Sequence, residues 1–194
     1  IIFVASASGF TYIMNGITLT FNILYLIVGG IVGGYIGSKL TAMIKTKSLE
    51  KIFSVLLVIV SIRMFLNGNF ESSFNENPFF YIIIGIVTGI LSGLLGIGGG
   101  IVRIPLLIIF GGLENIVAQG FSLIATIPTA MTAAVTKLKG NPELIKQGTY
   151  IGLFGIIGSI IGGNAAFLMS QNVLNTVFAI FLLIVSFNLY LKKD

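Results

Sequence analysis

The stretch GLLGIGGGIVRIPLLIIFGG, residues 93–112, interrupts a chain that is otherwise almost continuously apolar. Four glycines fall within the five residues 96–100, and Arg103 and Pro105 follow. Backbone that is not helical is tolerated at membrane depth only where protein buries it or where it lines a water-filled cavity. The stretch therefore predicts a break between two helices, and the surrounding sequence indicates whether those helices lie in a membrane.

The composition is that of an integral membrane protein. Apolar residues make up 56% of the 194 residues and charged residues 9%, and the mean hydropathy is +1.07. A soluble domain carries about 25% charged residues, so this chain could not cover its surface with polar groups in water. Its long apolar runs lack the strict alternation of barrel strands. The predicted fold is an all-α, polytopic membrane bundle.

Eight apolar segments are predicted as helices. They cover residues 1–14, 17–44, 49–67, 79–97, 100–112, 115–136, 143–168 and 172–191. Segment 100–112 would span only about 20 Å at about 1.5 Å per residue, which predicts a half-helix or a short tilted helix. The first residues, IIFVASASGF, are typical of a helix already under way rather than of a signal peptide. We therefore expect further sequence upstream of Ile1.

A shift of 125 residues superposes two parts of the chain. Under this shift Gly30, Gly33 and Gly37 fall on Gly155, Gly158 and Gly162, and Leu49, Phe53 and Leu57 fall on Leu174, Phe178 and Leu182. We interpret the chain as a duplication within one membrane domain. Residues 1–67 form a first repeat that lacks its N-terminal part, 68–78 an external loop, and 79–194 the second repeat.

The lysines predict the orientation of the two repeats. They cluster in 45–51, in 137–146 and at the C-terminus, whereas loop 67–78 holds only Glu71 and Glu76. The positive-inside rule places the lysine-rich segments and the C-terminus in the cytoplasm. All three clusters share one side only if the repeats are inverted and each crosses the membrane an odd number of times, an architecture typical of secondary transporters.

The glycine-rich break is the first candidate site. Gly98, Gly99 and Gly100 can leave backbone amides free, and Pro105 has no N–H. A helix that begins after Gly100 would direct its positive dipole end toward an anion, and Arg103, one turn inside, would add a full charge. The alternative is close helix packing, with the Arg103 side chain extending to the cytoplasmic interface.

A series of hydroxyl side chains is the second candidate. Steps of four, three, three and four residues keep its members within about 120° of one helix face. They are Ser122, Thr126, Thr129, Thr132 and Thr136. With Pro128 in the same segment, the series indicates a polar pathway for an oxyanion, or alternatively hydrogen bonds to neighbouring helices.

Small residues at helical spacing predict close helix packing. Gly85, Gly89 and Gly93 follow the small-xxx-small pattern that lets membrane helices approach closely. We expect the series Gly30–Gly37 and Gly155–Gly163 to lie at the contact between the two repeats.

Several classes of function are disfavoured. The chain has no cysteine and no histidine, which removes disulfides, thiol chemistry, soft-metal sites and imidazole catalysis. No acidic residue lies well inside a predicted span, and no P-loop or dinucleotide motif occurs in its required context. We predict that the protein is not an enzyme and uses no cofactor or metal. Its expected partners are a small anion and the lipid bilayer, with no nucleic acid, and the oligomeric state stays open.

The order of these motifs resembles the sulfite exporter TauE/SafE family, also described as 4-toluene sulfonate uptake permeases. The matching elements are Gly98-Gly99-Gly100, Ile104-Pro105-Leu106, Ala118-x-Gly120-x-Ser122-Leu123, Gly140-Asn141 and the glycine series 155–163. The resemblance covers residues 79–191 and, more weakly, 10–66. It implies a multi-pass permease of the inner or plasma membrane that moves sulfite or organosulfonates. The first copy of the glycine-triplet element does not occur in this sequence.

The sequence thus predicts a secondary transporter for small anions that works by alternating access. A passive anion channel and a non-transporting membrane scaffold subunit are the alternatives. The predicted substrate-binding residues are Gly98, Gly99, Gly100, Arg103, Pro105, Ser122, Thr126 and Thr129.

Overall fold

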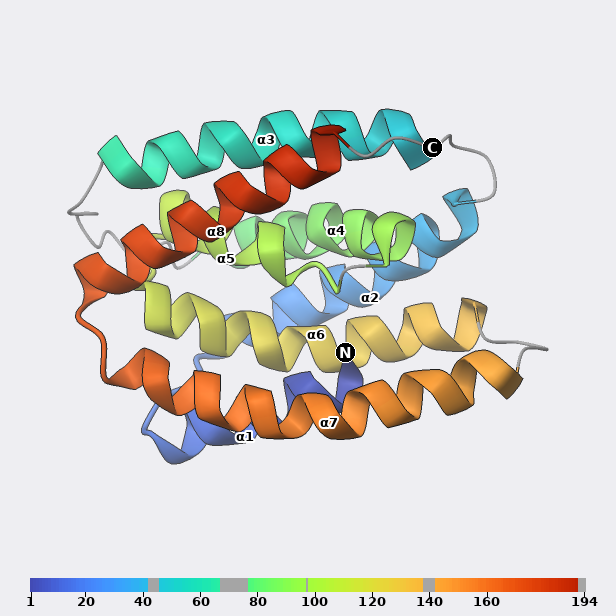
Figure 1. Cartoon of the computed structure of the whole chain (residues 1–194), viewed down its shortest axis with the longest axis horizontal. Coiled ribbons are helices and arrows are strands. Elements are labelled where there is room, and N and C mark those ends of the chain that lie inside the picture. Colours follow the sequence, from blue (N-terminus) through green and yellow to red (C-terminus); the bar gives the residue numbers. More distant parts are fainter. Residues whose placement is uncertain (42–45, 67–76, 97, 138–141, 192–194) are drawn as a thin grey trace.

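The part of the chain that the structure describes consists of eight α-helices (Figure 1). The structure is a computed structural model and describes residues 1–41, 46–66, 77–96, 98–137 and 142–191. The helices are α1 (Ile2–Met14), α2 (Asn22–Leu40), α3 (Thr46–Leu66), α4 (Pro78–Leu95), α5 (Gly100–Ile109), α6 (Asn115–Lys137), α7 (Pro142–Phe167) and α8 (Gln171–Leu191). The predicted all-α fold is confirmed, and no strand occurs among these residues.

Helix ends differ from the predicted segments where local backbone chemistry, not hydropathy, sets the boundary. The predicted segment 17–44 begins as a helix only at Asn22, because the chain first turns through Gly16 at a φ of 87°. Helix α4 begins at Pro78, where the Asn77 side chain accepts a hydrogen bond from the amide of Phe79 at 3.0 Å. Lys51 and Lys146 lie inside α3 and α7 rather than in loops. The predicted turn Gly140-Asn141 falls outside the described residues.

The exterior of the bundle is suited to lipid. Four described stretches are long and apolar enough to cross a bilayer: Asn22–Leu40, Asn115–Val135, Ile145–Phe167 and Gln171–Leu191. Large apolar side chains on the outside, such as Phe154 on α7 and Phe187 on α8, are well over half exposed. Contiguous apolar surface of this kind is disfavoured in water and matched by hydrocarbon. The chain is a multi-pass helical membrane protein.

Helices α2 and α4 approach so closely that their contact has no room for side chains. A methyl group on Gly33 would lie 2.2 Å from the carbonyl oxygen of Ile86, and one on Gly89 would lie 2.5 Å from that of Gly30. Gly85 and Gly93 face α2 backbone in the same way. The predicted packing role of the series Gly85–Gly89–Gly93 is therefore confirmed.

The glycine series of α7 is only partly covered. Gly155 and Gly163 contact Val4 and Thr11 of α1, whereas no described atom lies within 4 Å of the position a methyl group would take on Gly158 or Gly162. The predicted contact therefore forms at Gly155 and Gly163 and not at Gly158 and Gly162. A series of glycines shows that another helix can approach closely, but the sequence pattern does not identify which helix does so.

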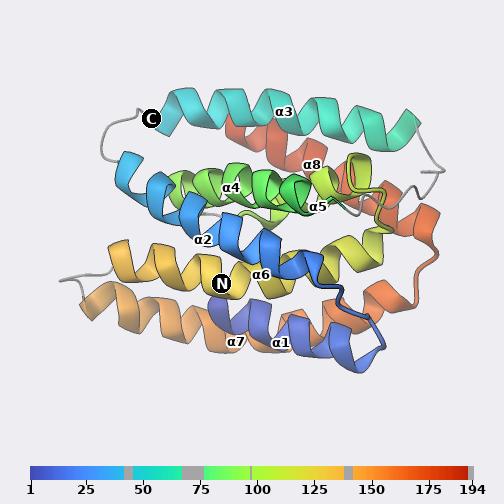
Figure 2. The same ribbon diagram turned by 180° about the vertical axis from the view of Figure 1, so that it is seen from behind.

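Helices α3 and α8 lie side by side and run in opposite directions (Figures 1 and 2). Ser61 Oγ donates to the carbonyl of Ala179 at 2.9 Å, and Ser186 Oγ donates to the carbonyl of Ser54 at 2.8 Å. The shift of 125 residues converts one of these bonds into the other, so the two bonds connect equivalent positions. The two helices therefore bind each other through reciprocal contacts.

The glycine-rich stretch reverses the chain inside the bundle. Gly96, Gly98 and Gly99 adopt φ values of 73°, 78° and 71°, which glycine alone adopts readily. After this reversal α5 begins near the middle of the bundle and returns to the end at which α4 began (Figure 1). Its ten residues span only about 15 Å. The predicted half-helix at the glycine-rich element is confirmed.

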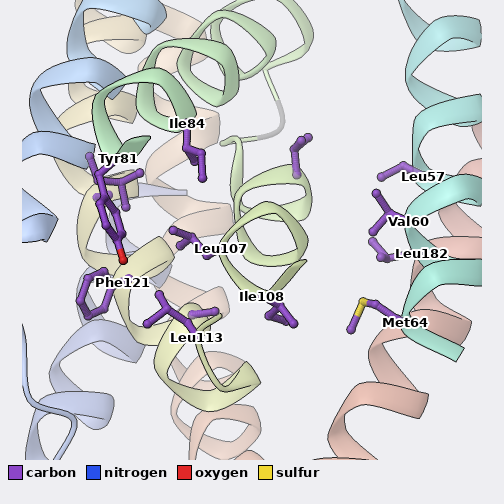
Figure 3. Close-up of a cluster of buried hydrophobic side chains, with 14 of the residues drawn as sticks. Leu57, Val60, Met64, Tyr81, Ile84, Leu107, Ile108, Leu113, Phe121 and Leu182 are labelled. Carbon is purple, nitrogen blue, oxygen red and sulfur yellow. The ribbon is translucent and has the colours of Figure 1, made fainter. Parts of the chain in front are cut away.

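The hydrophobic core surrounds this half-helix. Leu107 and Ile108 of α5 are fully buried, with Tyr81 and Ile84 of α4 nearby (Figure 3). Leu57, Val60 and Met64 of α3 and Leu182 of α8 face α5 from the other side (Figure 3). This apolar packing holds the C-terminal half of α5 in place within the bundle.

We predict that Gly33→Ala lowers the thermal stability of the purified protein, because its methyl group would overlap the Ile86 carbonyl, a strain of about 1–3 kcal/mol. Gly158→Ala is the matched control, since it is the equivalent position under the 125-residue shift and faces open space. Thermal unfolding in detergent should separate the two variants. Equal melting temperatures would contradict the packing assigned to α2 and α4.

Candidate functional site

Arg103 is the centre of the candidate site, and its side chain is completely buried. It lies in the first turn of α5, which begins directly after Gly99. Its Nε donates to Thr88 Oγ1 of α4 at 3.2 Å, and its Nη1 donates to Thr126 Oγ1 and to the carbonyl of Ser122 at 3.1 and 3.2 Å. The alternative of a side chain that extends to the membrane interface is therefore wrong.

One nitrogen of this guanidinium has no hydrogen-bond partner among the residues that the structure describes. Nη2 is buried and bonds to no atom of the described residues, and the groups that bind Nε and Nη1 are all neutral. Nη2 faces backbone without side chains, since a methyl group on Gly99 would lie 3.5 Å from it and one on Gly30 3.6 Å. A buried cation without a counter-charge is costly. The site therefore has the charge and the free donor that an anion requires.

The beginning of α5 adds positive potential at the same place. The amides of Gly98, Gly99, Gly100 and Ile101 donate to no acceptor in the described part of the chain. First-turn amides without an acceptor and the helix dipole favour a negative charge at a helix N-terminus. A cation close to this terminus is unfavourable by itself, so a negative charge between the terminus and Arg103 would stabilise both.

The hydroxyl series of α6 contributes the next contacts. Thr126 Oγ1 accepts from Arg103 and lies 2.7 Å from the carbonyl of Ser122 and 3.2 Å from that of Gly98. It therefore joins the arginine, the glycine break and its own helix. The hydroxyl of Ser122 lies 3.4 Å from the position of a methyl group on Gly100.

The remaining predicted residues are placed less uniformly. Thr129 donates to the carbonyl of Ala125 at 2.7 Å and touches Gly30. Pro105 is buried one turn further along α5, where it leaves one helical hydrogen bond unmade. Thr132 is half-buried and donates to the carbonyl of Pro128 at 2.9 Å, and the side chain of Thr136 lies outside the described part. The structure thus brings Gly98, Gly99, Gly100, Arg103, Ser122, Thr126 and Thr129 together.

Thr88 and Gly30 belong to the site although the sequence did not single them out for it. Thr88 interrupts the glycine series of α4 and is completely buried. Its hydroxyl donates to the carbonyl of Ile84 at 2.7 Å, which leaves its oxygen free to accept from Arg103. A single threonine within an apolar helix does not by itself indicate a binding site. Its role becomes clear only from the position of α5, which places Arg103 beside it.

A second polar cluster joins α1, α6 and α8. Asn115 Nδ2 donates to Asn175 Oδ1 at 2.7 Å, Gln119 Nε2 donates to Asn115 Oδ1 at 2.7 Å, and the Tyr12 hydroxyl donates to Gln119 Oε1. These groups bind one another, which is the usual way in which buried polar groups stabilise helix contacts in membranes. The cluster therefore has a structural role.

A cavity of about 470 Å³ opens beside the glycine break. Ser92, Gly96 and Gly98 line it together with the small side chains Ala130, Ala133 and Ala134 of α6. Arg103 is not part of its lining. The cavity therefore reaches the break while the guanidinium stays closed off behind it.

A family model described as sulfite exporter TauE/SafE matches residues 81–194, which is more than half of the chain. The chain belongs to this family. The matched region contains the reversal at Gly98 and Gly99, Arg103 and the hydroxyl series. Most of the site described above is therefore formed by the part of the chain that carries the family pattern.

Similar proteins are named as probable membrane transporter proteins. YunE of Bacillus subtilis is 29% identical over 118 residues, which cover 57% of this chain and 43% of YunE. A protein of Xylella fastidiosa is 28% identical over 177 residues, which cover 84% of this chain and 66% of that protein. One of Methanocaldococcus jannaschii is 41% identical over 63 residues, 30% of this chain and 23% of that protein. The chain thus spans less than two thirds of the YunE and Xylella proteins, and no solved structure matches it.

We predict that Thr126→Val destabilises the protein by about 1–3 kcal/mol, because it leaves Arg103 Nη1 and the Gly98 carbonyl without this hydroxyl. Thr176→Val is the control, since the exposed Thr176 bonds only to the carbonyl of Asn172 in its own helix. Thermal unfolding of both variants gives the comparison. A Thr126→Val variant as stable as Thr176→Val would show that the hydroxyl does not support the arginine.

Proposed function

We propose that the protein transports small oxyanions by alternating access, with sulfite or organosulfonates as the substrate class. The observation that carries this proposal is Arg103, which is buried, bonded only to neutral groups and left with a free Nη2. A sulfur oxyanion offers several acceptor oxygens, so it can bind Nη2 and the free amides at the start of α5 together. The family description, sulfite exporter, agrees with this chemistry.

The closure of the site favours a transporter over a passive channel. A channel needs a continuous path for the ion, whereas Arg103, Gly98 and Gly99 are all buried. The neighbouring cavity ends at the break and does not include the guanidinium. An anion would reach Arg103 only after helices move apart, which is the step that alternating access supplies. A scaffold subunit would gain nothing from an unpaired buried cation.

The helix directions support two inverted repeats. Helices α3 and α8 are equivalent under the 125-residue shift and run antiparallel, and α2 and α7 also run in opposite directions (Figures 1 and 2). The reciprocal serine bonds between α3 and α8 are those expected around a two-fold axis between these helices. Rocking of one repeat against the other about this axis would expose the site to each side in turn.

The lysine distribution supports a cytoplasmic orientation for one end of the bundle. Lys39 lies in the last turn of α2, and Lys51 and Lys146 lie in the first two turns of α3 and α7; these helix ends are all at the same end of the bundle (Figure 1). Arg63 and Glu114 lie toward the opposite end. We propose that the protein lies in the plasma or inner membrane. The positive-inside rule then favours a cytoplasmic location for the lysine-rich end and the C-terminus.

We predict that Arg103→Gln weakens anion binding about tenfold or more, because it removes the charge and the free Nη2 donor. Arg63→Gln is the control, since Arg63 is an exposed residue in the last turn of α3. Thermal stabilisation of the purified protein by sulfite or 4-toluenesulfonate, followed by uptake into proteoliposomes, measures the effect. Unchanged stabilisation and uptake in Arg103→Gln would refute the assignment of the site.

Cysteine labelling tests the orientation, and the chain offers a clean background because it contains no cysteine. Ser170→Cys lies between α7 and α8, and Lys146→Cys lies near the start of α7, both at exposed positions. We expect a membrane-impermeant maleimide to label Ser170→Cys in intact cells and Lys146→Cys only after the membrane is opened. The opposite pattern would reverse the orientation.

A further inference from the structure

We propose that the site works as an anion exchanger, which changes sides readily only when an anion is bound. Release of one anion on one side is then coupled to binding of another before the site returns. This inference rests on the proposed transport function and adds to it the mode of coupling. It starts from the charge balance around Arg103.

No acidic side chain among the described residues bonds to Arg103. Its partners are two threonine hydroxyls and one carbonyl oxygen, all uncharged. The acidic residues that the structure describes, Glu50, Glu114 and Glu143, lie near helix ends rather than at the start of α5. The whole sequence has no histidine that could take up or release a proton. In the described part of the protein, only a bound anion can therefore neutralise the guanidinium.

The neutral partners of Arg103 position its side chain but do not compensate its charge. Thr88 lies on α4, and Ser122 and Thr126 lie on α6. These helices and α5 all belong to the second repeat, so rocking of one repeat against the other moves Arg103 together with its neutral partners. An empty site would then change sides with an unpaired cation at membrane depth, which is strongly disfavoured. A bound anion removes this barrier because it travels with the charge.

The free nitrogen lies where the two repeats meet. Gly30 belongs to α2 of the first repeat, whereas Gly99 and Arg103 belong to the second. A methyl group added to Gly30 would lie 3.6 Å from Nη2, and one added to Gly99 would lie 3.5 Å from it. An anion oxygen bound to Nη2 would therefore lie at the surface along which the repeats must slide. A bound anion would therefore neutralise the charge at this surface while the repeats move.

Counterflow in proteoliposomes that contain the full-length protein tests the proposal. Uptake of radiolabelled sulfite is compared between vesicles loaded with unlabelled sulfite and vesicles loaded with gluconate, and the pair is repeated with 4-toluenesulfonate. We expect an initial rate about tenfold higher or more with the transported anion inside, the factor that corresponds to one charge-assisted hydrogen bond. Equal rates in the two loadings would overturn the exchange proposal and leave transport itself standing.

Absence of uptake in every loading, without thermal stabilisation by either anion, would instead overturn the proposed transport function. Stabilisation without uptake in any loading would also overturn exchange, since it would show binding to a site that does not move.

Two substitutions of Arg103 separate the role of its charge from a structural role. Arg103→Lys keeps the positive charge. We therefore expect weaker anion binding but the same ratio of the initial uptake rate in sulfite-loaded vesicles to that in gluconate-loaded vesicles. Arg103→Gln removes the charge, so the residual uptake should show a ratio near one, because the empty site can now return. Arg63→Gln should behave like the unchanged protein. A high ratio retained in Arg103→Gln would refute a role for the charge in coupling.

Discussion

The architecture depends on keeping a guanidinium at the centre of a membrane bundle. Arg103 requires partners on α4 and α6 together, and these are within reach only because α5 begins in the interior. That position requires the chain to reverse after α4, and the reversal requires positive φ at Gly98 and Gly99. The apolar core around Leu107 and Ile108 then fixes the half-helix. The glycines, the hydroxyl groups and the core thus all serve the placement of one charge.

Close helix packing gives the site its closed form. The absence of side chains at Gly33 and Gly89 lets α2 lie directly against the backbone of α4. This brings Gly30 of α2 to within contact distance of Thr129 and of the free nitrogen of Arg103. The same small residues therefore stabilise the bundle and limit the space beside the charge. A larger side chain at Gly30 would collide with Thr129 before it reached the guanidinium.

The sequence was sufficient for the helices and for most of the site, for different reasons. Hydropathy predicts all eight helices because membrane spans are long and uniformly apolar, and the length of 100–112 predicts the half-helix. The glycine triplet, Arg103 and the α6 hydroxyl groups come together because the break is followed directly by the short helix α5 and then by α6. Thr88 and Gly30 could not be assigned, since their roles depend on how α2 and α4 pack against α5. The open positions at Gly158 and Gly162 show the same limit, because spacing alone does not name a partner.

Comparison of equivalent contacts separates packing from chemistry at the site. Thr129 of α6 touches Gly30 of α2, and a shift of 125 residues converts this pair into Val4 of α1 and Gly155 of α7, which also touch. A methyl group on Gly30 would lie 2.6 Å from the hydroxyl oxygen of Thr129. A methyl group on Gly155 would lie at the same distance, 2.6 Å, from a methyl group of Val4. Valine and threonine have the same shape, so packing is satisfied by either, and the hydroxyl adds nothing to the fit. The hydroxyl is present only beside Arg103. The hydroxyl of Thr129 instead donates to the carbonyl of Ala125 in its own helix, so the contact with Gly30 is a packing contact like the one between α1 and α7.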